Sequence, residues 1–319
     1  MKKLIGILVF IMIVGTVVGC TQNTIKHKNQ IDDLSGDNTV QTSGDLEIEN
    51  VDSGEKNEES GDVIESQEET LEVEVTPVST SNLSNTVCAW GFVRKKDAVQ
   101  PEIYGPYSKV LNTYDGIYMG NSNDKRIYLT FDEGYENGYT ASILDTLKEK
   151  NVTAAFFVTM PYVKQNEALI QRMIDEGHIV GNHTVNHPSM PEVTDDAKLE
   201  KEVMDLHNYM VENFKYEMTY LRPPKGEYSE RTVKLCKDLG YTHVLWSSAY
   251  DDWDVNNQKG HDYAKKMILN YSHNGCVMLL HAVSKDNTEV LGEIIDSLRE
   301  KEYEFYSLDN FERWFFEKI

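Results

Sequence analysis

Positive charge is scarce in this chain: 31 Lys and Arg residues stand against 53 Asp and Glu residues, a formal net charge of -22. A surface of this sign repels phosphate backbones, which excludes nucleic acid as a natural partner and disfavours other polyanions at long range. The imbalance is uneven, because residues 21–80 carry 16 acidic residues and 3 lysines. An uncharged or zwitterionic polymer remains compatible with this charge.

Aromatic residues are missing altogether from residues 21–89. A segment this polar cannot bury enough apolar surface to offset the entropy lost on ordering, and its like charges favour an extended chain. We therefore expect residues 20–89 to be a disordered acidic spacer. Aromatic residues return abruptly from Trp90, and we expect residues 90–125 to be a lead-in that packs on the domain after it.

The chain also lacks an apolar run long enough to span a bilayer. Leu4–Val18 has 15 residues and follows Lys2 and Lys3, whereas a spanning helix needs about 20. Residues 1–19 therefore fit a secretory signal, and Val17-Val18-Gly19-Cys20 resembles the lipobox of bacterial lipoproteins. We expect an extracytoplasmic protein anchored to the membrane by lipid on Cys20, with an ordinary signal peptide or an uncleaved anchor as the alternatives.

Cysteine is rare, and no Cys-x-x-Cys pair occurs, so a cysteine-bound zinc site is not indicated. Apart from Cys20, the chain has Cys88, Cys236 and Cys276. At most one disulfide can form among three cysteines, and we expect free thiols in the core.

Short apolar runs alternate with helical patterns from Arg126 onward, and no internal repeat is seen. Such alternation predicts an α/β domain with a parallel sheet. Residues 126–319 are fewer than the ~250 of a complete eightfold barrel, so a barrel with a missing unit and an open doubly wound sheet both fit. The expected strands are 127–131, 154–158, 179–181, 219–221, 242–246, 276–280 and 304–306. The expected helices are 138–150, 167–176, 195–214, 229–239, 262–272, 289–301 and 308–316.

Ionisable residues gather where the expected strands end, which is the rim that carries catalytic groups in such folds. They are Asp132, Glu133, His183, His187, Arg222, Asp252 and His281. His183 and His187 are four residues apart, a spacing that puts both imidazoles on one face of a helical turn and suits a divalent ion. With a carboxylate from another strand end, the pattern favours a hydrolytic metal site.

Five motifs in order resemble NodB-like polysaccharide deacetylases, the carbohydrate esterases of family four. They are Thr130-Phe-Asp-Glu133, His183-Thr-Val-Asn-His187, Arg222-Pro-Pro-Lys-Gly226, Asp252-Trp253 and Leu279-Leu-His281. The longer run from Thr130 to Tyr139 and the segment from Asn256 to Gly260 resemble the bacterial subgroup that deacetylates muramic acid and prepares the δ-lactam of the spore cortex. The resemblance covers about residues 90–315.

This resemblance implies a distorted, incomplete (β/α) barrel, the NodB-homology domain, and assigns a role to each motif residue. Asp132 would be the general base, held by Arg222, and His281 the general acid, oriented by Asp252. Glu133, His183 and His187 would bind a divalent metal ion, zinc or another. The backbone N–H of Lys225 would bind the oxyanion, while Trp253 and Leu279 would line a slot for the acetyl methyl group. Structural roles are the alternatives: a helix cap for Asp132, an ion pair between Arg222 and Asp252, and core packing for Trp253 and Leu279.

Glu133 departs from the family, most of which has Asp there, while the muramic-acid subgroup often has Asn. The extra methylene of Glu moves the carboxylate by about 1.5 Å, so we expect an altered or weaker metal site. The expected function is metal-assisted N-deacetylation of N-acetylmuramic acid in cell-wall peptidoglycan by a monomer. The alternatives are deacetylation of N-acetylglucosamine, ester deacetylation, and a non-catalytic glycan-binding module.

Overall fold

The computed structural model describes residue 80 and residues 82–312 of the chain. In this part a seven-stranded sheet runs β10-β4-β5-β6-β7-β9, with β11 paired to β4 off that path. All these pairings are parallel. The strands are β4 (Arg126–Glu133), β5 (Ala155–Val158), β6 (Ile179–Asn182), β7 (Tyr220–Leu221), β9 (Thr242–His243), β10 (Cys276–His281) and β11 (Glu304–Phe305).

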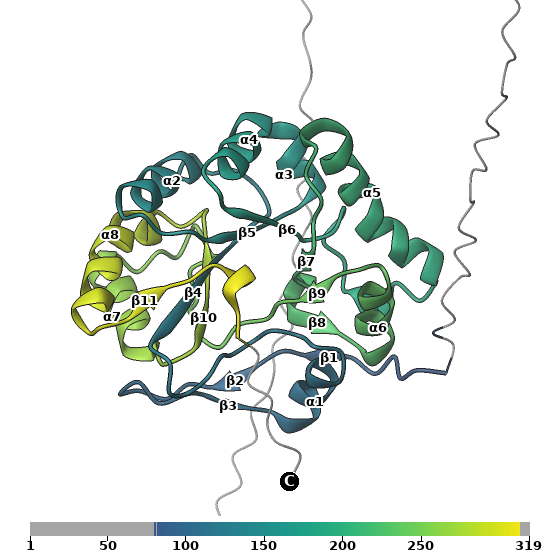
Figure 1. Ribbon diagram of the computed structural model, residues 1–319, viewed down its shortest axis with the longest axis horizontal. Helices are drawn as coiled ribbons and strands as arrows, with labels where there is room; N and C mark the ends of the chain where they lie inside the picture. The colour runs from purple at the N-terminus through teal and green to yellow at the C-terminus, as the bar shows by residue number, and fades with distance from the viewer. Residues whose placement is uncertain (1–79, 81, 313–319) are drawn as a thin grey trace, which may run out of the picture. The chain divides into compact units, whose positions relative to one another are not determined.

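Helices surround the outside of these strands (Figure 1). Several of them begin at capping side chains, which satisfy backbone N–H groups that the first helical turn leaves free. Asp195 accepts from the backbone of Lys198, and Ser229 forms a capping box with Thr232. The helices are α2 (Thr140–Glu149), α3 (Met160–Gln165), α4 (Glu167–Asp175), α5 (Asp196–Phe214), α6 (Glu230–Asp238), α7 (His261–Tyr271) and α8 (Lys285–Glu300).

Side chains of β4 alternate between two cores, as the twofold period of a strand requires. Odd-numbered residues 127–131 lie in the large core between sheet and helices, whereas Tyr128 lies in a small core inside the curled sheet. The same alternation directs Asp132 to the inside of the curl and Glu133 to the side covered by helices. The alternation along β4 therefore places the carboxyl group of Asp132 in the site and that of Glu133 outside it.

The curled sheet is completed by isolated bridges instead of a full strand pair. Ser248 bridges Met278 of β10, and the N–H of Ser247 donates to the carbonyl of Val277 at 2.9 Å. The opening that these bridges narrow lies between β9 and β10. On its β9 side, Ile117 bridges Val244, which directly follows β9. The architecture is therefore an α/β fold with a distorted, incomplete barrel, which confirms the expected fold class.

Residues 82–125, which we call the N-terminal wrap, pack on the domain with four short elements. These are β1 (Cys88–Ala89), β2 (Phe92–Val93), β3 (Glu102–Ile103) and α1 (Gly105–Thr113). The amide of Asn85 donates to the carbonyl of Pro191 at 2.9 Å, and its oxygen accepts from Ser229 and Arg231. Folded structure thus begins before Trp90, and the expected boundary at residue 89 is too late. Backbone pairing and the polar side chain of Asn85 fix residues 82–89 to the domain. A count of apolar residues therefore could not predict that these residues are folded.

Most expected elements are present, although β9 ends three residues earlier and α8 begins four residues earlier than expected. Helix α3 was not expected, and of the final helix expected over 308–316 only the 3-10 turn η3 (Leu308–Asn310) is formed before residue 312. Cys88, Cys236 and Cys276 are buried free thiols, as expected. The expected signal sequence, Cys20 and the expected spacer up to residue 79 lie outside the described residues. In residues 82–312 none of the helices is long and apolar enough to cross a membrane.

Candidate active site

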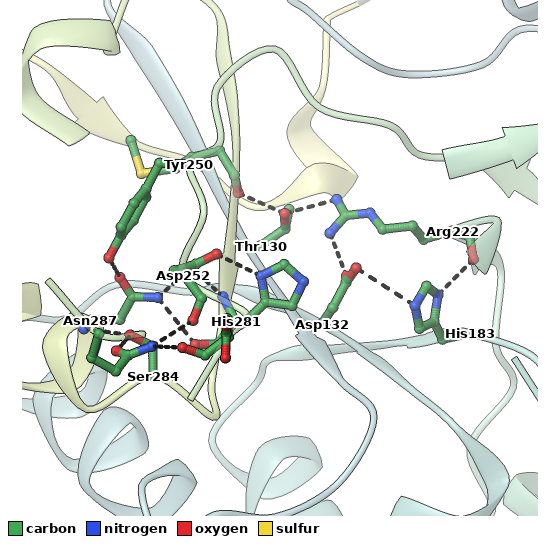
Figure 2. A network of polar contacts seen from close by, with 12 residues as sticks. Thr130, Asp132, His183, Arg222, Tyr250, Asp252, His281, Ser284 and Asn287 are labelled. Carbon is green, nitrogen blue, oxygen red and sulfur yellow. Dashed lines mark hydrogen bonds and ion pairs between the residues drawn. The ribbon is translucent and has the colours of Figure 1, made fainter. Parts of the chain in front are cut away.

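The carboxylate of Asp132, on β4, is held by a buried arginine that follows β7 (Figure 2). Arg222 donates from Nη1 to Asp132 Oδ1 at 2.7 Å and from Nη2 to Thr130 Oγ1 at 2.8 Å. Its Nε donates to the carbonyl of Val244 at 3.1 Å, and the guanidinium lies 4.1 Å from the centre of the Phe157 ring. Each guanidinium nitrogen has an acceptor, so Arg222 fixes both the position and the orientation of Asp132.

Opposing effects set the pKa of Asp132. Burial raises it, because a carboxylate loses water there. The guanidinium of Arg222 lowers it, and so do the imidazoles of His183 and His281 in the acidic range in which they are protonated and Asp132 titrates. The net pKa lies below the ordinary value of 3.8. Asp132 is therefore ionised at neutral pH, which is the state a general base requires.

His183 and His187 meet in the loop after β6, with ring centroids 4.7 Å apart. The expected helical turn is wrong: Thr184 and His187 have φ values of 68° and 55°, in the left-handed region. Asn182 Oδ1 accepts from the Thr184 amide at 2.8 Å, and Thr184 Oγ1 accepts from the His187 amide at 3.0 Å. These local bonds stabilise the loop and bring the two imidazoles together without a helix.

The two histidines have the donor chemistry of a metal site. His183 Nδ1 lies 2.8 Å from the carbonyl of Arg222, which can only accept, so Nδ1 carries the proton and Nε2 has a lone pair. Burial lowers the pKa of His183 to about 4 and also lowers that of His187, so both rings are neutral at pH 7. His183 Nε2 faces Asp132 Oδ2 at 3.6 Å, and a cation between them would relieve the repulsion of these two acceptors. The donor set therefore fits a divalent ion.

Glu133 lies on the other side of β4 and does not join the histidines. Its side chain is buried beside α2, where Thr140 Oγ1 donates to Oε1 at 3.3 Å and Oε2 has no hydrogen-bond partner. Burial, followed by the charge of Glu136, raises the pKa of Glu133 well above 4.5. Within residues 80–312, no group of three or more His, Cys, Asp or Glu side chains is placed to hold a metal. The geometry thus offers two histidines as metal donors and gives no support to Glu133 as the third.

His281 ends β10 and lies beside Asp132, its register partner on β4. Asp252 holds it twice, through Oδ1 to Nδ1 at 2.8 Å and through Oδ2 to the backbone N–H at 2.8 Å. Burial lowers the pKa of His281, but the charge and hydrogen bond of Asp252 and the charge of Asp132 raise it, and the net pKa lies above 6.5. His281 is thus suited to donate a proton, and Asp252 pairs with it, not with Arg222.

Two residues that the sequence analysis missed support Asp252 (Figure 2). Asn287 Nδ2 donates to Asp252 Oδ2 at 2.5 Å and to the carbonyl of His281 at 3.1 Å. Tyr250 donates its hydroxyl proton to Asn287 Oδ1 at 2.5 Å, which fixes the orientation of the amide. The available signal was the pattern Ser284-x-x-Asn287 directly after His281, a helix cap with a polar residue on the buried side.

A cavity of about 610 Å³ opens onto these groups. It is lined by Asp132, Gly134, Tyr135, His183, His187, Lys225, Trp246, Trp253, Leu279, His281 and Val283. Lys225, Trp253 and Leu279 all reach this cavity; Trp253 is 63% exposed and Leu279 only 4%. Tyr135 is half exposed and was missed, although an aromatic residue three positions after the expected general base was a signal for sugar contact. Asp252 and Arg222 act from behind the cavity wall.

A carboxylate with a lowered pKa, an imidazole with a raised pKa beside it and two imidazoles with lowered pKa values lie in one cavity, an arrangement typical of a hydrolase site. Residues 119–244 match the polysaccharide deacetylase family. The chain is 44% identical to the peptidoglycan-N-acetylmuramic acid deacetylase PdaA of Bacillus subtilis over 222 residues, 69% of this chain and 84% of PdaA. An uncharacterised 30.6 kDa protein of Geobacillus stearothermophilus is 45% identical over 73% of this chain and 88% of its own length.

Solved structures agree with this relationship. The structure of Bacillus subtilis PdaA, a family 4 carbohydrate esterase, superimposes with a TM-score of 0.70 at 41% identity, covering 72% of this chain and 98% of PdaA. A family 4 carbohydrate esterase from Bacillus anthracis gives a TM-score of 0.60 at 44% identity, covering 72% of this chain and 97% of the other. The chain belongs to the polysaccharide deacetylases of carbohydrate esterase family 4. It is a hydrolase that acts on carbon–nitrogen bonds.

Proposed function

We propose that the chain removes the acetyl group from N-acetylmuramic acid in peptidoglycan. The observation that carries the proposal is the pairing of Asp132 with His281 on adjacent strands and in one cavity, where the net pKa of Asp132 is lowered and that of His281 is raised. Amide hydrolysis needs a base for the water and an acid for the departing nitrogen. The relatives named for muramic acid and peptidoglycan support the choice of sugar.

Asp132 takes a proton from the water that attacks the acetyl carbonyl carbon, while Arg222 keeps the carboxylate in place. The backbone N–H of Lys225 donates to the oxygen that becomes negative in the tetrahedral intermediate. Trp253 and Leu279 contact the acetyl methyl group. The water oxygen is thereby bonded to the acetyl carbon, and its proton rests on Asp132.

His281 gives its Nε2 proton to the sugar nitrogen as the carbon–nitrogen bond breaks, and Asp252 stabilises the imidazolium before transfer. The products are acetate and a free amine on the sugar. A divalent ion held by His183 and His187 would polarise the acetyl carbonyl and make the water more acidic. The new amine of muramic acid stands next to its lactyl carboxyl group, so the product can close to the δ-lactam of spore cortex.

Deacetylation of N-acetylglucosamine is the second candidate. Peptidoglycan-N-acetylglucosamine deacetylase PgdA of Listeria monocytogenes is 31% identical over 58% of this chain. Ester deacetylation would use the same base and oxyanion site. It would depend less on a general acid, because the leaving group is an alcohol oxygen and not an amine nitrogen. A non-catalytic binding role is not favoured, because it gives no reason for Arg222 to orient Asp132 and for Asp252 to orient His281 in the same cavity.

The test is incubation of the purified protein with peptide-free and peptide-bearing glycan strands, measuring acetate and identifying the deacetylated sugar by mass spectrometry. We expect deacetylated muramic acid with divalent ion present. Asp132→Asn and His281→Ala should each lower kcat by about 10²–10⁴-fold while remaining folded. Acetate released from N-acetylglucosamine alone would instead establish the second candidate, and full activity of either variant would remove the role given to that residue.

We further propose that the enzyme works outside the cytoplasm, tethered by lipid on Cys20. A wall polymer as substrate and the apolar run of residues 4–18 support the location. The Val17-Val18-Gly19-Cys20 sequence supports the tether.

A further inference from the structure

The N-terminal wrap touches the turn that carries Lys225. Strand β1 pairs antiparallel with β8 (Glu227–Tyr228), which begins directly after this turn. One residue beyond β1, the backbone N–H of Trp90 donates to the carbonyl of Gly226 at 2.9 Å. The wrap therefore fixes the end of the Pro223–Gly226 turn from outside the barrel.

The turn has a conformation that needs such support. Lys225 and Gly226 have φ values of 60° and 67°, so two consecutive residues are left-handed, and for Lys225 this is strained. A Cβ on Gly226 would stand 3.0 Å from both the Cβ of Trp90 and the Cη2 of Trp246. The turn is thus packed tightly between two tryptophans, which limits the directions in which the Lys225 peptide can relax.

Trp90 also holds the second tryptophan. Its indole Nε1–H donates to the carbonyl of Trp246 at 2.8 Å. Trp246 lines the cavity, and the Arg222 guanidinium lies 5.5 Å from its ring centre. The Trp90 side chain itself is nearly buried and packs on Tyr118 and Tyr228. Trp90 lies outside the cavity but contacts both Trp246 and the turn of Lys225, which form parts of the cavity wall.

We propose that Trp90 is a positioning residue, which places the backbone N–H of Lys225 and the ring of Trp246 for the reaction. This inference rests on the proposed function, because it assigns the Lys225 N–H to the developing oxyanion. A donor aimed at the oxyanion acts mainly in the transition state, so its displacement lowers kcat more than it raises KM. Residues 82–125 are then a working part of the enzyme.

The test compares Trp90→Phe, which removes the indole N–H and keeps an aromatic ring, with Tyr118→Phe as the matched control. Tyr118 donates its hydroxyl to Asn112 within the wrap at 3.0 Å and makes no hydrogen bond to the turn. We expect Trp90→Phe to lower kcat about tenfold with KM within about twofold. A phosphonamidate analogue of the tetrahedral intermediate should bind about tenfold more weakly, and Tyr118→Phe should change neither quantity by more than about twofold.

Hydrogen exchange separates this proposal from the proposed function, because it needs no activity. The amide of Gly226, which donates to the carbonyl of Pro223 at 3.1 Å, should exchange faster in Trp90→Phe than in Tyr118→Phe, because the indole N–H no longer holds Trp246, whose ring packs on Gly226. Equal exchange at this amide in the two variants, or a kcat for Trp90→Phe equal to that of Tyr118→Phe, would overturn the positioning role. If the unaltered protein released no acetate from any glycan, the proposed function would fail, and the exchange result would still decide whether Trp90 holds the turn.

Discussion

The last two residues of β4, Asp132 and Glu133, point to opposite sides of the sheet. Asp132 points into the curl, where nearby positive charge, above all that of Arg222, outweighs burial and lowers its pKa. Glu133 points to the helices, where burial raises its pKa well above 4.5. The motif predicts one site for Asp132 and Glu133, because the two residues are consecutive in it. The period of two along a strand was available from the sequence and argues against a shared site.

A pH-dependent loss of stability follows from the burial of Glu133. Its folded pKa is raised, so above about pH 4.5 the unfolded chain releases a proton that the folded chain keeps. Stability then falls by about 1.4 kcal/mol per pH unit, up to the folded pKa. Glu133→Gln keeps the shape and the contact with Thr140 but cannot ionise. It should therefore gain stability relative to the parent as pH rises from 5 to 8, as measured by urea unfolding at both values.

Glu149→Gln is the matched control for Glu133→Gln, since Glu149 lies exposed on α2 and its replacement should change stability equally at both pH values. Calorimetric zinc titration adds a second readout. Glu133→Gln should bind the ion within about threefold of the parent, and His187→Ala should bind it at least tenfold more weakly. Loss of binding in Glu133→Gln would show that Glu133 is a ligand and that the outward orientation is wrong.

At the scale of elements, the strands and helices of the domain could be predicted from the sequence, because each buries an apolar face that repeats with the period of a strand or of a helix. The boundaries of β4, β10, α5 and α6 differ from expectation by a few residues at most. Loops could not be predicted, because their shape depends on single hydrogen bonds such as the one that the Thr184 amide donates to Asn182 Oδ1. For the same reason the histidine spacing suggested a helical turn that does not form, and Asn287 behind Asp252 was missed.

The connection into β10 has the tightest backbone contact among the described glycines. Gly275 has a φ of 66°, its carbonyl accepts from the Gly120 amide at 2.7 Å, and a Cβ there would lie 2.4 Å from the Gly120 carbonyl carbon. Gly275→Ala should destabilise the protein by more than about 2 kcal/mol, by clash as well as by conformation. Gly240→Ala is the matched control, since its φ is 90° and no other atom lies near. Urea unfolding of both variants checks this, and equal losses would refute the clash.

The whole molecule combines a catalytic domain with a long acidic segment and, as we propose, an N-terminal lipoprotein signal. We expect Cys20→Ser to release the protein from membranes or leave it unprocessed, because the acyl chains of a lipoprotein supply most of the membrane affinity. Fractionation and mass analysis of cells that carry the parent or Cys20→Ser measure this outcome. Cys88→Ser is the control and should stay membrane-bound. Unchanged retention and mass for Cys20→Ser would defeat the lipid anchor.

The pairing of β4 with β10 joins segments from opposite ends of the catalytic domain. A chain exported in extended form leaves the cell N-terminus first, so Asp132 emerges long before His281. Until β10 docks, Asp132 has no His281 beside it and the cavity lacks one wall. Long-range parallel pairing of this kind also forms slowly. On the proposed route of export, a half-exported chain would therefore be unable to cut the wall around its own exit point, and activity would begin only after β10 had passed through the membrane.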